Sequence, residues 1–567
     1  MTLVEAPATT SGWRDWLHLL SAFFASPAGK RYRKILALLV VFALAVAGVQ
    51  VLMSYAGRDF MTAIAGKDRA GYWHHLWRYL GTFALAVPIA VFYRFTEERL
   101  ALAWRQWMMQ HLIKRYFYNR AYYRLKGSVI DNPDQRIAAD VESFTQRTLS
   151  FLLIMLNSVM TLIAFLGVLW SISGTLVGVL FAYAVFGTAG SILLGRRLIR
   201  LHNVQSGLEA DLRHGLIRVR DHAESIAFYR GEKREHRGLI RQVTSLVQNF
   251  LNIIGWNRNL AFFTNSYNYA ALVVPVVIVA PLYFDGKVEF GVVAQATGAF
   301  AQVLAALSLV ITQFDGISRY AASANRLRGI WNAMDEYDAE EKRESEEEGL
   351  TVDESRHRSL SLKEVTVNTP DRSRELVSGL TVEVSGGRSL LLMGASGTGK
   401  SSLLRTIAGI WPTGAGEISR PLLNKMFFLP QRPYMIVGSL REQLLYPAPD
   451  REMSVEEMKD ALREVNLPDL PDGAKCDWDT ELDWENVLSL GEQQRLSFAR
   501  LFLHKPAIAF LDEATSALDE DNERLLYEKL RASGITYISV GHRSTLKEFH
   551  DEVITLTPDG SYLVESR

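Results

Sequence analysis

Long apolar segments recur along the chain before about residue 335, and none follows. Six of them are candidate membrane spans, at about 35–55, 79–97, 149–171, 175–195, 260–284 and 292–314. Each is near the ~20 residues that a helix needs to cross the hydrocarbon core. The second candidate contains Pro88 and is flanked by Arg78 and Arg94, so it requires snorkelling arginines and a helix that continues beyond the membrane. The pattern predicts a polytopic α-helical membrane domain with six transmembrane helices.

The two longest segments between candidate spans also have a helical pattern. Residues 98–148 and 196–259 place apolar residues three and four positions apart, among many Leu, Ala, Arg and Glu. Gly127 to Pro133 and Arg230-Gly231 provide turn residues near the middle of each segment. We therefore expect membrane helices that project far into the cytoplasm, end in short turns, and reach a soluble motor domain.

Positive charge predicts the orientation of these helices. Lys30, Arg31, Arg33 and Lys34 precede the first span, Lys and Arg crowd the stretch 94–147, and Arg196, Arg197 and Arg200 follow the fourth. The loops after the third and fifth spans are short and nearly free of positive charge, while the loop after the first span is a mild exception. The positive-inside rule then places both termini in the cytoplasm.

Polar residues interrupt three of the spans. They are Asn157, Ser158 and Thr161 in the third span, residues 264–269 (TNSYNY) in the fifth, and Gln295 and Gln302 in the sixth. Polar groups at membrane depth need partners or a wet cavity. Hydrogen bonding between helices and cavity lining both remain open, and the density of the run from Thr264 to Asn268 favours a polar substrate path.

The pattern of the chain divides it into four parts. Residues 1–33 resemble an amphipathic segment at the membrane interface, and residues 34–334 form the membrane domain. A charged linker follows at 335–358, and alternating short strands and helices at 359–567 indicate a soluble α/β domain. The formal net charge is +0, so no overall field favours nucleic acid, and the single Cys476 excludes an internal disulfide framework.

A phosphate-binding motif opens the soluble part. An apolar strand from Ser389 leads into a glycine-rich loop and then into a helix start, which is the order that this motif requires. The nucleotide-binding residues that we predict here are Gly394, Ala395, Ser396, Gly397, Thr398, Gly399, Lys400, Ser401 and Ser402. Backbone N–H groups of the loop and the helix N-terminus would hold the phosphates of ATP. Lys400 would reach the β and γ phosphates, and Ser401 would ligate Mg²⁺.

A second apolar strand, 507–511, ends in two carboxylates. Asp512 would hold Mg²⁺ through water, and Glu513 would activate the attacking water as the catalytic base. An apolar strand ending in two acids is weak evidence alone, but it is strong evidence when it follows a phosphate-binding loop at this distance.

Further motifs resemble those of the ABC transporter superfamily. Residues 488–495 (LSLGEQQR) look like the ABC signature, Gln431 in LPQRP resembles the Q-loop, residues 516–519 the D-loop, and His542 the switch histidine. The resemblance implies that two nucleotide domains sandwich two ATP molecules. It implies that Ser489 and Gly491 contact the γ-phosphate held by the opposite protomer, that Gln431 joins the Mg²⁺ site, and that His542 is catalytic.

The chain departs from the superfamily pattern in two places. Leu490 and Glu492 stand in the signature where many members have Gly and Gln. In addition, the stretch 364–371 (EVTVNTPD) lacks the aromatic residue that usually stacks on adenine, which leaves Val367, Pro370 or an unidentified residue for that contact.

The membrane half is similar to two subgroups of transporters. Residues 130–137 (IDNPDQRI) with Asp140, and residues 224–232 (ESIAFYRGE), resemble inner-loop motifs of the peroxisomal fatty-acyl half-transporters (subfamily D) and of the SbmA/BacA-related bacterial transporters. The resemblance covers roughly 30–567 and implies an exporter-like helix arrangement in an ATP-driven homodimer in a bacterial inner membrane.

By this resemblance, the transported solutes would be peptides, cobalamin-like molecules or other bulky hydrophilic compounds. Two other interpretations stay open. A fatty acyl-CoA transporter would need basic residues around the cavity, yet residues 260–314 carry only Lys287. A proton-driven permease of the SbmA type would leave the nucleotide domain idle, which the intact Lys400, Asp512, Glu513 and His542 argue against.

Overall fold

The computed structural model describes residues 21–125, 132–307, 314–344, 349–355, 359–369, 372–411, 413–448, 450–473 and 478–566. The chain separates into two compact units, Met1–Asp338 and Ala339–Arg567, and each is described by itself. The predicted interfacial segment at 1–33 lies largely outside the described residues. In the described part of this segment, Phe23 is buried and packs against Trp104, with 5.9 Å between the ring centroids.

Unit 1 is built from long helices. They are α2 (Pro27–Ala65), α3 (Arg69–Phe117), α6 (Val141–Ile172), α7 (Gly174–Asp221), α9 (Glu232–Phe284), α10 (Phe290–Leu307) and α12 (Phe314–Glu344). Shorter turns are η1 (Tyr118–Arg120), α4 (Ala121–Leu125), α5 (Pro133–Gln135), the π-helix η2 (Arg136–Asp140) and α8 (Ala223–Tyr229). Within the described residues, six helices are long and apolar enough to cross a membrane, which confirms the predicted polytopic helical domain.

Local sequence signals set the ends of the first two helices. The Ser26 side chain accepts a hydrogen bond from the Gly29 N–H, 3.0 Å away, and Pro27 occupies the first turn of α2. Asp68 caps α3 by accepting bonds from the N–H groups of Ala70 and Gly71. Such caps satisfy backbone donors that have no partner within the helix. Residues 66–68 alone separate α2 from α3, as a short loop between two spans requires.

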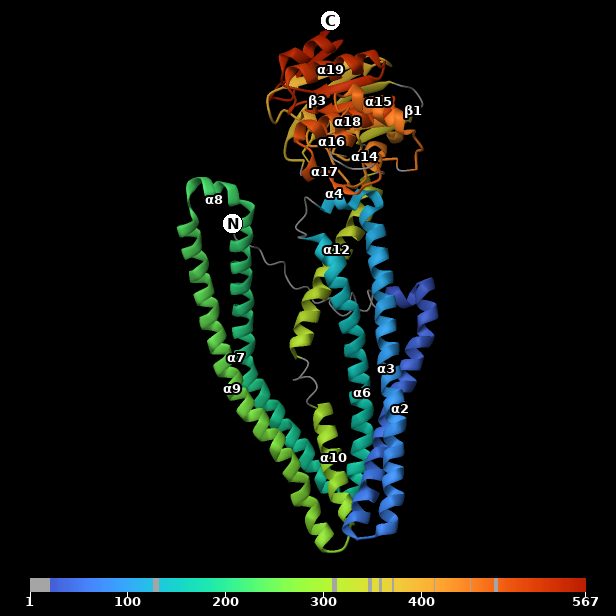
Figure 1. The fold of residues 1–567 in the computed structure, drawn as a ribbon, viewed down its shortest axis with the longest axis vertical. Helices are drawn as coiled ribbons and strands as arrows, with labels where there is room; N and C mark the ends of the chain where they lie inside the picture. The colour runs from blue at the N-terminus through green and yellow to red at the C-terminus, as the bar shows by residue number, and fades with distance from the viewer. Residues whose placement is uncertain are drawn as a thin grey trace. The chain divides into compact units, whose positions relative to one another are not determined.

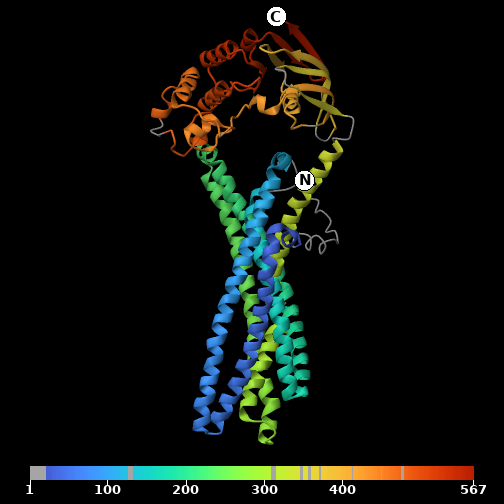
Figure 2. The same cartoon turned by 90° about the vertical axis from the view of Figure 1, so that its right-hand side faces the viewer.

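Helices α7 and α9 run side by side in both views (Figures 1 and 2) and are in extensive contact. Small residues permit this close packing. A Cβ atom at Gly187 would lie 2.2 Å from the ring of Tyr267, and one at Gly190 would lie 2.3 Å from the ring of Phe263. These contacts place two glycines of α7 beneath two aromatic rings of α9, so larger residues at either position would force the helices apart.

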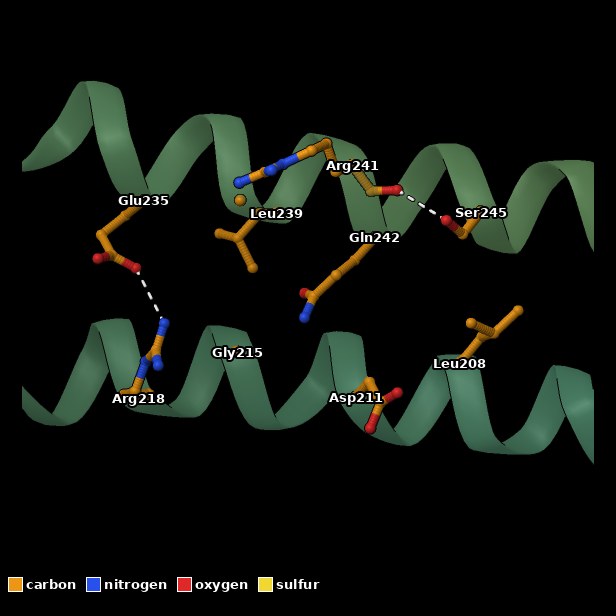
Figure 3. A pocket seen from close by; sticks show the side chains of 10 residues that line it. Leu208, Asp211, Gly215, Arg218, Glu235, Leu239, Arg241, Gln242 and Ser245 are labelled. Carbon is orange, nitrogen blue, oxygen red and sulfur yellow. Dashed lines mark hydrogen bonds and ion pairs between the residues drawn. The ribbon is translucent and has the colours of Figure 1, made fainter.

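The α7–α9 pair continues beyond its apolar segments to α8, where the predicted second inner turn lies. Figure 3 shows a pocket between the two helices in this polar part. Arg218 of α7 and Glu235 of α9 form an ion pair of 3.2 Å across it. Of the first predicted inner turn, Gly127 to Pro133, residues 127–131 lie outside the described residues, and Pro133 begins α5.

The polar residues of the spans divide into two groups. Asn157 donates a hydrogen bond of 2.8 Å to the Tyr93 hydroxyl, so it links α6 to α3. Tyr267 donates to the backbone carbonyl of Tyr183, and Tyr183 donates to that of Tyr267, which ties α9 to α7. In contrast, residues 265, 266 and 268 (Asn, Ser and Asn) are exposed on α9. Hydrogen bonds between helices therefore occur in the protein, and cavity lining stays a prediction for the exposed polar residues of α9.

Unit 2 has an α/β fold, with three sheets among its described residues. The strands are β1 (Leu350–Ser355), β2 (Leu360–Asn368), β3 (Glu375–Val384), β4 (Ser389–Gly394), β5 (Gly414–Pro421), β6 (Met426–Leu429), β7 (Val437–Gly438), β8 (Leu482–Asp483), β9 (Ile508–Asp512), β10 (Thr536–Val540), β11 (Glu552–Leu556) and β12 (Tyr562–Ser566). The helices are α13 (Lys400–Ile407), η3 (Leu423–Lys425), α14 (Leu440–Leu445), α15 (Val455–Glu464), α16 (Leu470–Gly473), α17 (Trp484–Val487), α18 (Leu490–His504), α19 (Glu520–Ala532) and η4 (Ser544–Phe549).

The largest sheet has the strand order β12-β11-β4-β10-β9-β6. Its members from β11 to β6 are parallel, whereas β12 pairs antiparallel with β11. A second sheet has the order β1-β5-β2-β3. Within the range predicted as a charged linker, residues 335–344 continue α12 and Leu350–Ser355 forms β1, which pairs parallel with β5.

A buried histidine makes the stability of unit 2 depend on pH. The ring of His550 bonds to the Leu546 carbonyl through Nδ1 at 2.7 Å and to the Ser539 hydroxyl through Nε2 at 2.8 Å. Burial is the main reason that the pKa of His550 falls to about 4. Since an unfolded histidine has a pKa near ~6.5, the unfolded chain binds more protons between these two values. The stability from this residue is therefore complete above the unfolded pKa and is lost as the pH falls toward 4.

We expect His550→Gln to reduce the pH dependence of unfolding. Between pH 7.5 and pH 5, the histidine should account for about 2 kcal/mol of lost stability, because glutamine can keep both hydrogen bonds without titrating. The unfolding midpoint of unit 2 in the full chain, followed by fluorescence at both pH values, measures this. His202→Gln, at an exposed position on α7, is the control. An equal midpoint shift in His550→Gln and in the unaltered protein would contradict the assignment.

Candidate functional site

Four parallel strands place most of the predicted site residues at one edge of the large sheet. β4 ends at Gly394 and leads into the glycine-rich loop, and β9 ends at Asp512. Gln431 follows β6, and His542 follows β10. Because β4, β10, β9 and β6 are adjacent and parallel, their carboxyl ends meet at the same edge. Ligands of open α/β sheets bind at that edge.

The glycine-rich loop has a backbone that only glycine adopts easily. Gly394, Gly397 and Gly399 have φ values of +142°, +84° and +93°. A Cβ at Gly394 would lie 2.4 Å from the Leu556 carbonyl oxygen, and one at Gly399 would lie 2.9 Å from Leu376. Two of these glycines are thus required by close approach as well as by conformation. The loop leads directly into α13, whose N-terminus favours an anion.

Lys400 lies folded back over this loop. Its Nζ donates hydrogen bonds to the carbonyl oxygens of Gly394 at 3.0 Å and Ala395 at 2.8 Å. Burial lowers the pKa of Lys400, and the nearby carboxylates of Glu513 and Asp512 oppose that shift. The ammonium group therefore lies over the loop that the sequence predicts to hold the phosphates.

A pair of oxygen ligands lies beside the lysine. The Ser401 hydroxyl donates a hydrogen bond of 2.9 Å to Oδ1 of Asp512. Burial raises the pKa of Asp512, and the Glu513 charge adds to that effect, whereas the Ser401 bond opposes it. Hydroxyl and carboxylate oxygens suit Mg²⁺. Among the described residues, no group of three His, Cys, Asp or Glu side chains could hold a metal, so nucleotide phosphates and water would have to complete the shell.

Glu513 is at the centre of a second group. Its Oε2 accepts a hydrogen bond of 2.8 Å from Nε2 of Gln431, and its Oε1 lies 3.1 Å from Nε2 of His542. Its backbone has φ of +50°, so the chain turns abruptly after Asp512. The predicted base thus contacts both the Q-loop glutamine and the switch histidine. The Gln431 amide faces Glu513, while Ser401 and Asp512 face each other.

The signature motif forms the N-terminus of α18. Ser489 is the N-cap and Glu492 is three residues later, and each side chain bonds the other's backbone N–H in a capping box. This arrangement explains why a glutamate fits at 492, since the motif takes Glu or Gln at that position. Hydrogen bonding to Ser489 also lowers the pKa of Glu492. A Cβ at Gly491 would lie 3.2 Å from the Ala517 carbonyl oxygen, which favours glycine there.

Gln494 makes a connection that the sequence motifs did not reveal. Its Nε2 donates to the Gln431 carbonyl at 2.9 Å and to the Ser516 hydroxyl at 3.2 Å, and its Oε1 accepts from the Ala517 N–H at 3.0 Å. The side chain is 1% exposed. It therefore links the signature helix to the Q-loop and the D-loop, and its place inside the signature string was the available signal.

The structure bears on two further predictions, the adenine contact and the position of the signature residues. Val367 was one candidate for stacking on adenine, but it is fully buried in the core of unit 2 and offers no exposed face. Pro370, the other candidate, lies outside the described residues. Within the described part of the chain, no hydrogen bond joins Ser489 or Gly491 to residues 394–402. The two signature residues are thus not brought to the phosphate loop of their own chain by such a bond.

Comparison with known proteins identifies both units. The family described as ABC transporter transmembrane region 2 matches residues 19–284, and the family described as ABC transporter matches residues 377–516. The fold and site thus define a membrane transporter driven by ATP hydrolysis. The chain belongs to the ABC transporter family, as a half-transporter with relatives in subfamily D.

Three relatives illustrate this membership. An uncharacterised ABC transporter ATP-binding protein of Synechocystis is 44% identical over 99% of this chain and 86% of the relative. The chloroplastic ABC transporter D family member 2 of Arabidopsis thaliana is 37% identical over 96% of this chain and 86% of the relative. The human lysosomal cobalamin transporter ABCD4 is 32% identical over 89% of this chain and 88% of the relative.

A solved structure supports the predicted exporter-like fold. A bacterial Atm1-family ABC exporter with ATP bound matches with a TM-score of 0.71 at 18% identity, covering 94% of this chain and 95% of that one. The predictions of a membrane domain followed by an ABC ATP-binding domain, and of ATP hydrolysis coupled to transport, are therefore confirmed. The subfamily D resemblance is confirmed too.

Proposed function

We propose that Glu513 is the catalytic base and that Ser401, Gln431 and Asp512 hold Mg²⁺ when ATP is bound. The position of Glu513 supports this role. Its carboxylate is an acceptor one residue beyond Asp512, at the sheet edge where the phosphate loop lies, and it contacts His542. Lys400 would exchange its two loop carbonyls for β- and γ-phosphate oxygens. His542 would orient Glu513 and the attacking water as the proton leaves.

The working form in this proposal is a homodimer in a bacterial inner membrane with both termini in the cytoplasm. Each chain carries one phosphate loop and one signature motif, so two chains would complete two composite sites. The positive charges that precede the first span and follow the fourth span support the orientation. The SbmA/BacA-like inner-loop motifs agree with a bacterial transporter.

The transported solute in this proposal is bulky, hydrophilic and without strong negative charge, of the cobalamin or peptide kind. The exposed run of α9 carries the argument, because Asn265, Ser266 and Asn268 present amides and a hydroxyl within a segment apolar enough to span a membrane. Uncharged polar groups at that depth suit a solute with many hydrogen-bonding groups. The relative named as a cobalamin transporter is consistent with this class.

A fatty acyl-CoA is the second candidate cargo, since the resemblance to subfamily D suggests it. Its phosphates would need cations along the path. Lys287, the basic residue that follows α9, is exposed and forms an ion pair of 2.9 Å with Asp285. That pairing neutralises the one cation that residues 260–314 carry, so the charge of this region favours the uncharged polar cargo.

We expect reconstituted vesicles to take up cobalamin or peptide in an ATP-dependent way, and acyl-CoA poorly. The double change Asn265→Ala with Asn268→Ala should lower uptake at least about tenfold, because two bonds to the solute worth about 1 kcal/mol each are lost. Asn252→Ala, at an exposed position on the same helix, is the matched control. Uptake of all three solutes unaffected by the double change would contradict the proposed path.

The same vesicles separate proton-driven transport from ATP-driven transport. Uptake that continues with the proton gradient collapsed and ATP present supports ATP-driven transport. Uptake that stops under those conditions would place the energy source in the gradient.

A further inference from the structure

The π-helix η2 contains a carboxylate that is buried and paired across a large distance in sequence. The Asp140 side chain is 4% exposed, and Arg326 of α12 grips it with two hydrogen bonds, Nε to Oδ2 at 2.7 Å and Nη2 to Oδ1 at 2.5 Å. A two-pronged guanidinium–carboxylate bond fixes orientation as well as distance. The pair therefore joins the start of α6 to α12 in one defined geometry.

A second contact joins the same two elements, with the donor on η2 and the acceptor on α12. Arg136, at the other end of η2, donates from Nη1 to the backbone carbonyl of Arg326 at 3.0 Å. A Cβ at Gly329 would lie 3.0 Å from that same Nη1, so a glycine leaves room for the guanidinium. Arg136 of the π-helix thus donates to α12, and Arg326 of α12 donates to the π-helix.

Further contacts extend along α12. Leu327, Ile330, Trp331 and Met334 are buried in one cluster with residues of α3, α6 and η2. Beyond them, Arg115 of α3 forms ion pairs with Asp335 at 2.7 Å and Asp338 at 2.9 Å. Successive turns of α12 are therefore attached to the membrane helices α3 and α6.

The ion pair between Asp140 and Arg326 has features that packing alone does not explain. The Asp140 carboxylate loses its contact with water, whereas the Arg326 side chain stays 45% exposed, so the ion pair adds little net stability compared with apolar residues. What it does provide is a fixed register between two elements. Asp140 also lies in a π-helix. This form is rare in proteins, and where it occurs it is often at a functional site. These features favour a role in transmitting motion.

We propose that Asp140, Arg326 and Arg136 form a latch that makes α12 move together with α3 and α6 during the ATP cycle. The proposal rests on the proposed function, in which nucleotide binding drives motion of the membrane helices. α12 is the segment through which the chain leaves unit 1, and β1 of unit 2 begins soon after it, at Leu350. A displacement of the ATPase unit would reach α12 through the chain itself. The latch would pass that displacement to α3 and α6, and Asp140 and Arg326 are positioning residues in it.

Hydrogen exchange on the full chain in lipid nanodiscs tests the latch. The unaltered protein should show ATP- and vanadate-dependent protection of residues 141–153 of α6. Asp140→Asn and Arg326→Gln should reduce that protection at least about fivefold, with basal ATP hydrolysis within about twofold of the unaltered rate. Arg326→Lys, which keeps the charge, should retain most of the protection. Arg105→Gln, which breaks a 3.0 Å ion pair between α3 and α6 without touching α12, is the matched control.

The outcomes separate cleanly. ATP-dependent protection of residues 141–153 that persists in Arg326→Gln would overturn the latch. The latch would also be overturned if the unaltered protein showed ATP-dependent protection at residues 394–402 but none at residues 141–153. Equal loss in Arg326→Gln and Arg326→Lys, with lowered thermal stability in both, would assign the pair to structure alone. Protection at residues 394–402 reports nucleotide binding independently, so failure of the ATP-driven cycle and failure of the latch give different results.

Discussion

Replacing Glu513 with glutamine should lower steady-state ATP hydrolysis by at least about a hundredfold while ATP still binds. An amide has nearly the same size as the carboxylate, and it can still meet Gln431 and His542, which lie 2.8 and 3.1 Å from the two Glu513 oxygens. It cannot accept the proton of the attacking water. The loss should therefore fall on the chemical step and leave the phosphate loop unchanged.

Phosphate release and equilibrium binding of labelled ATP, measured on the same preparation, check this expectation. ATP should accumulate in a slowly dissociating complex, because closure is no longer followed by hydrolysis. Glu520→Gln, at an exposed position in the first turn of α19, is the control and should hydrolyse ATP normally. Near-normal turnover in Glu513→Gln would move the base to another residue.

Much of this site could be predicted from the sequence because its chemistry is local. The phosphate loop needs consecutive residues with unusual backbone angles, so Gly394, Gly397 and Gly399 are visible in the string itself. Asp512 and Glu513 are also visible in the sequence, because they directly follow the apolar strand that positions them. The six membrane spans were visible because each satisfies its own length and hydropathy requirement.

Contacts between distant residues could not be predicted in the same way. Asp140 and Arg326 are separated by 186 positions, and neither lies in a pattern that names the other. Gln494 is inside a motif, yet its bonds to the Q-loop and D-loop depend on how three segments fold together. The burial of Val367 likewise depends on strand pairing: it pairs with Val377 of β3 and Gly414 of β5.

The second large effect concerns the composite site. Ser489→Arg and Lys400→Ala should each abolish hydrolysis in a pure homodimer, the first by filling the space for the γ-phosphate and the second by removing its cation. In a dimer with one chain of each kind, the Lys400 of the first chain meets the Ser489 of the second, and one site is complete. The alternative site combines both defects. Such heterodimers should recover up to about half of the unaltered activity per dimer.

Co-expression of the two variants with different affinity tags, followed by purification on both, isolates the heterodimer for this measurement. Lys400→Ala paired with Glu513→Gln supplies the matched control. Lys400 and Glu513 belong to the same side of the site, since Lys400 bonds to the loop after β4 and Glu513 follows β9 at the same sheet edge. That heterodimer leaves each site with one defect, so it should stay inactive. Recovery in the control pair, or full hydrolysis by a verified monomer, would mean that one chain completes its own site.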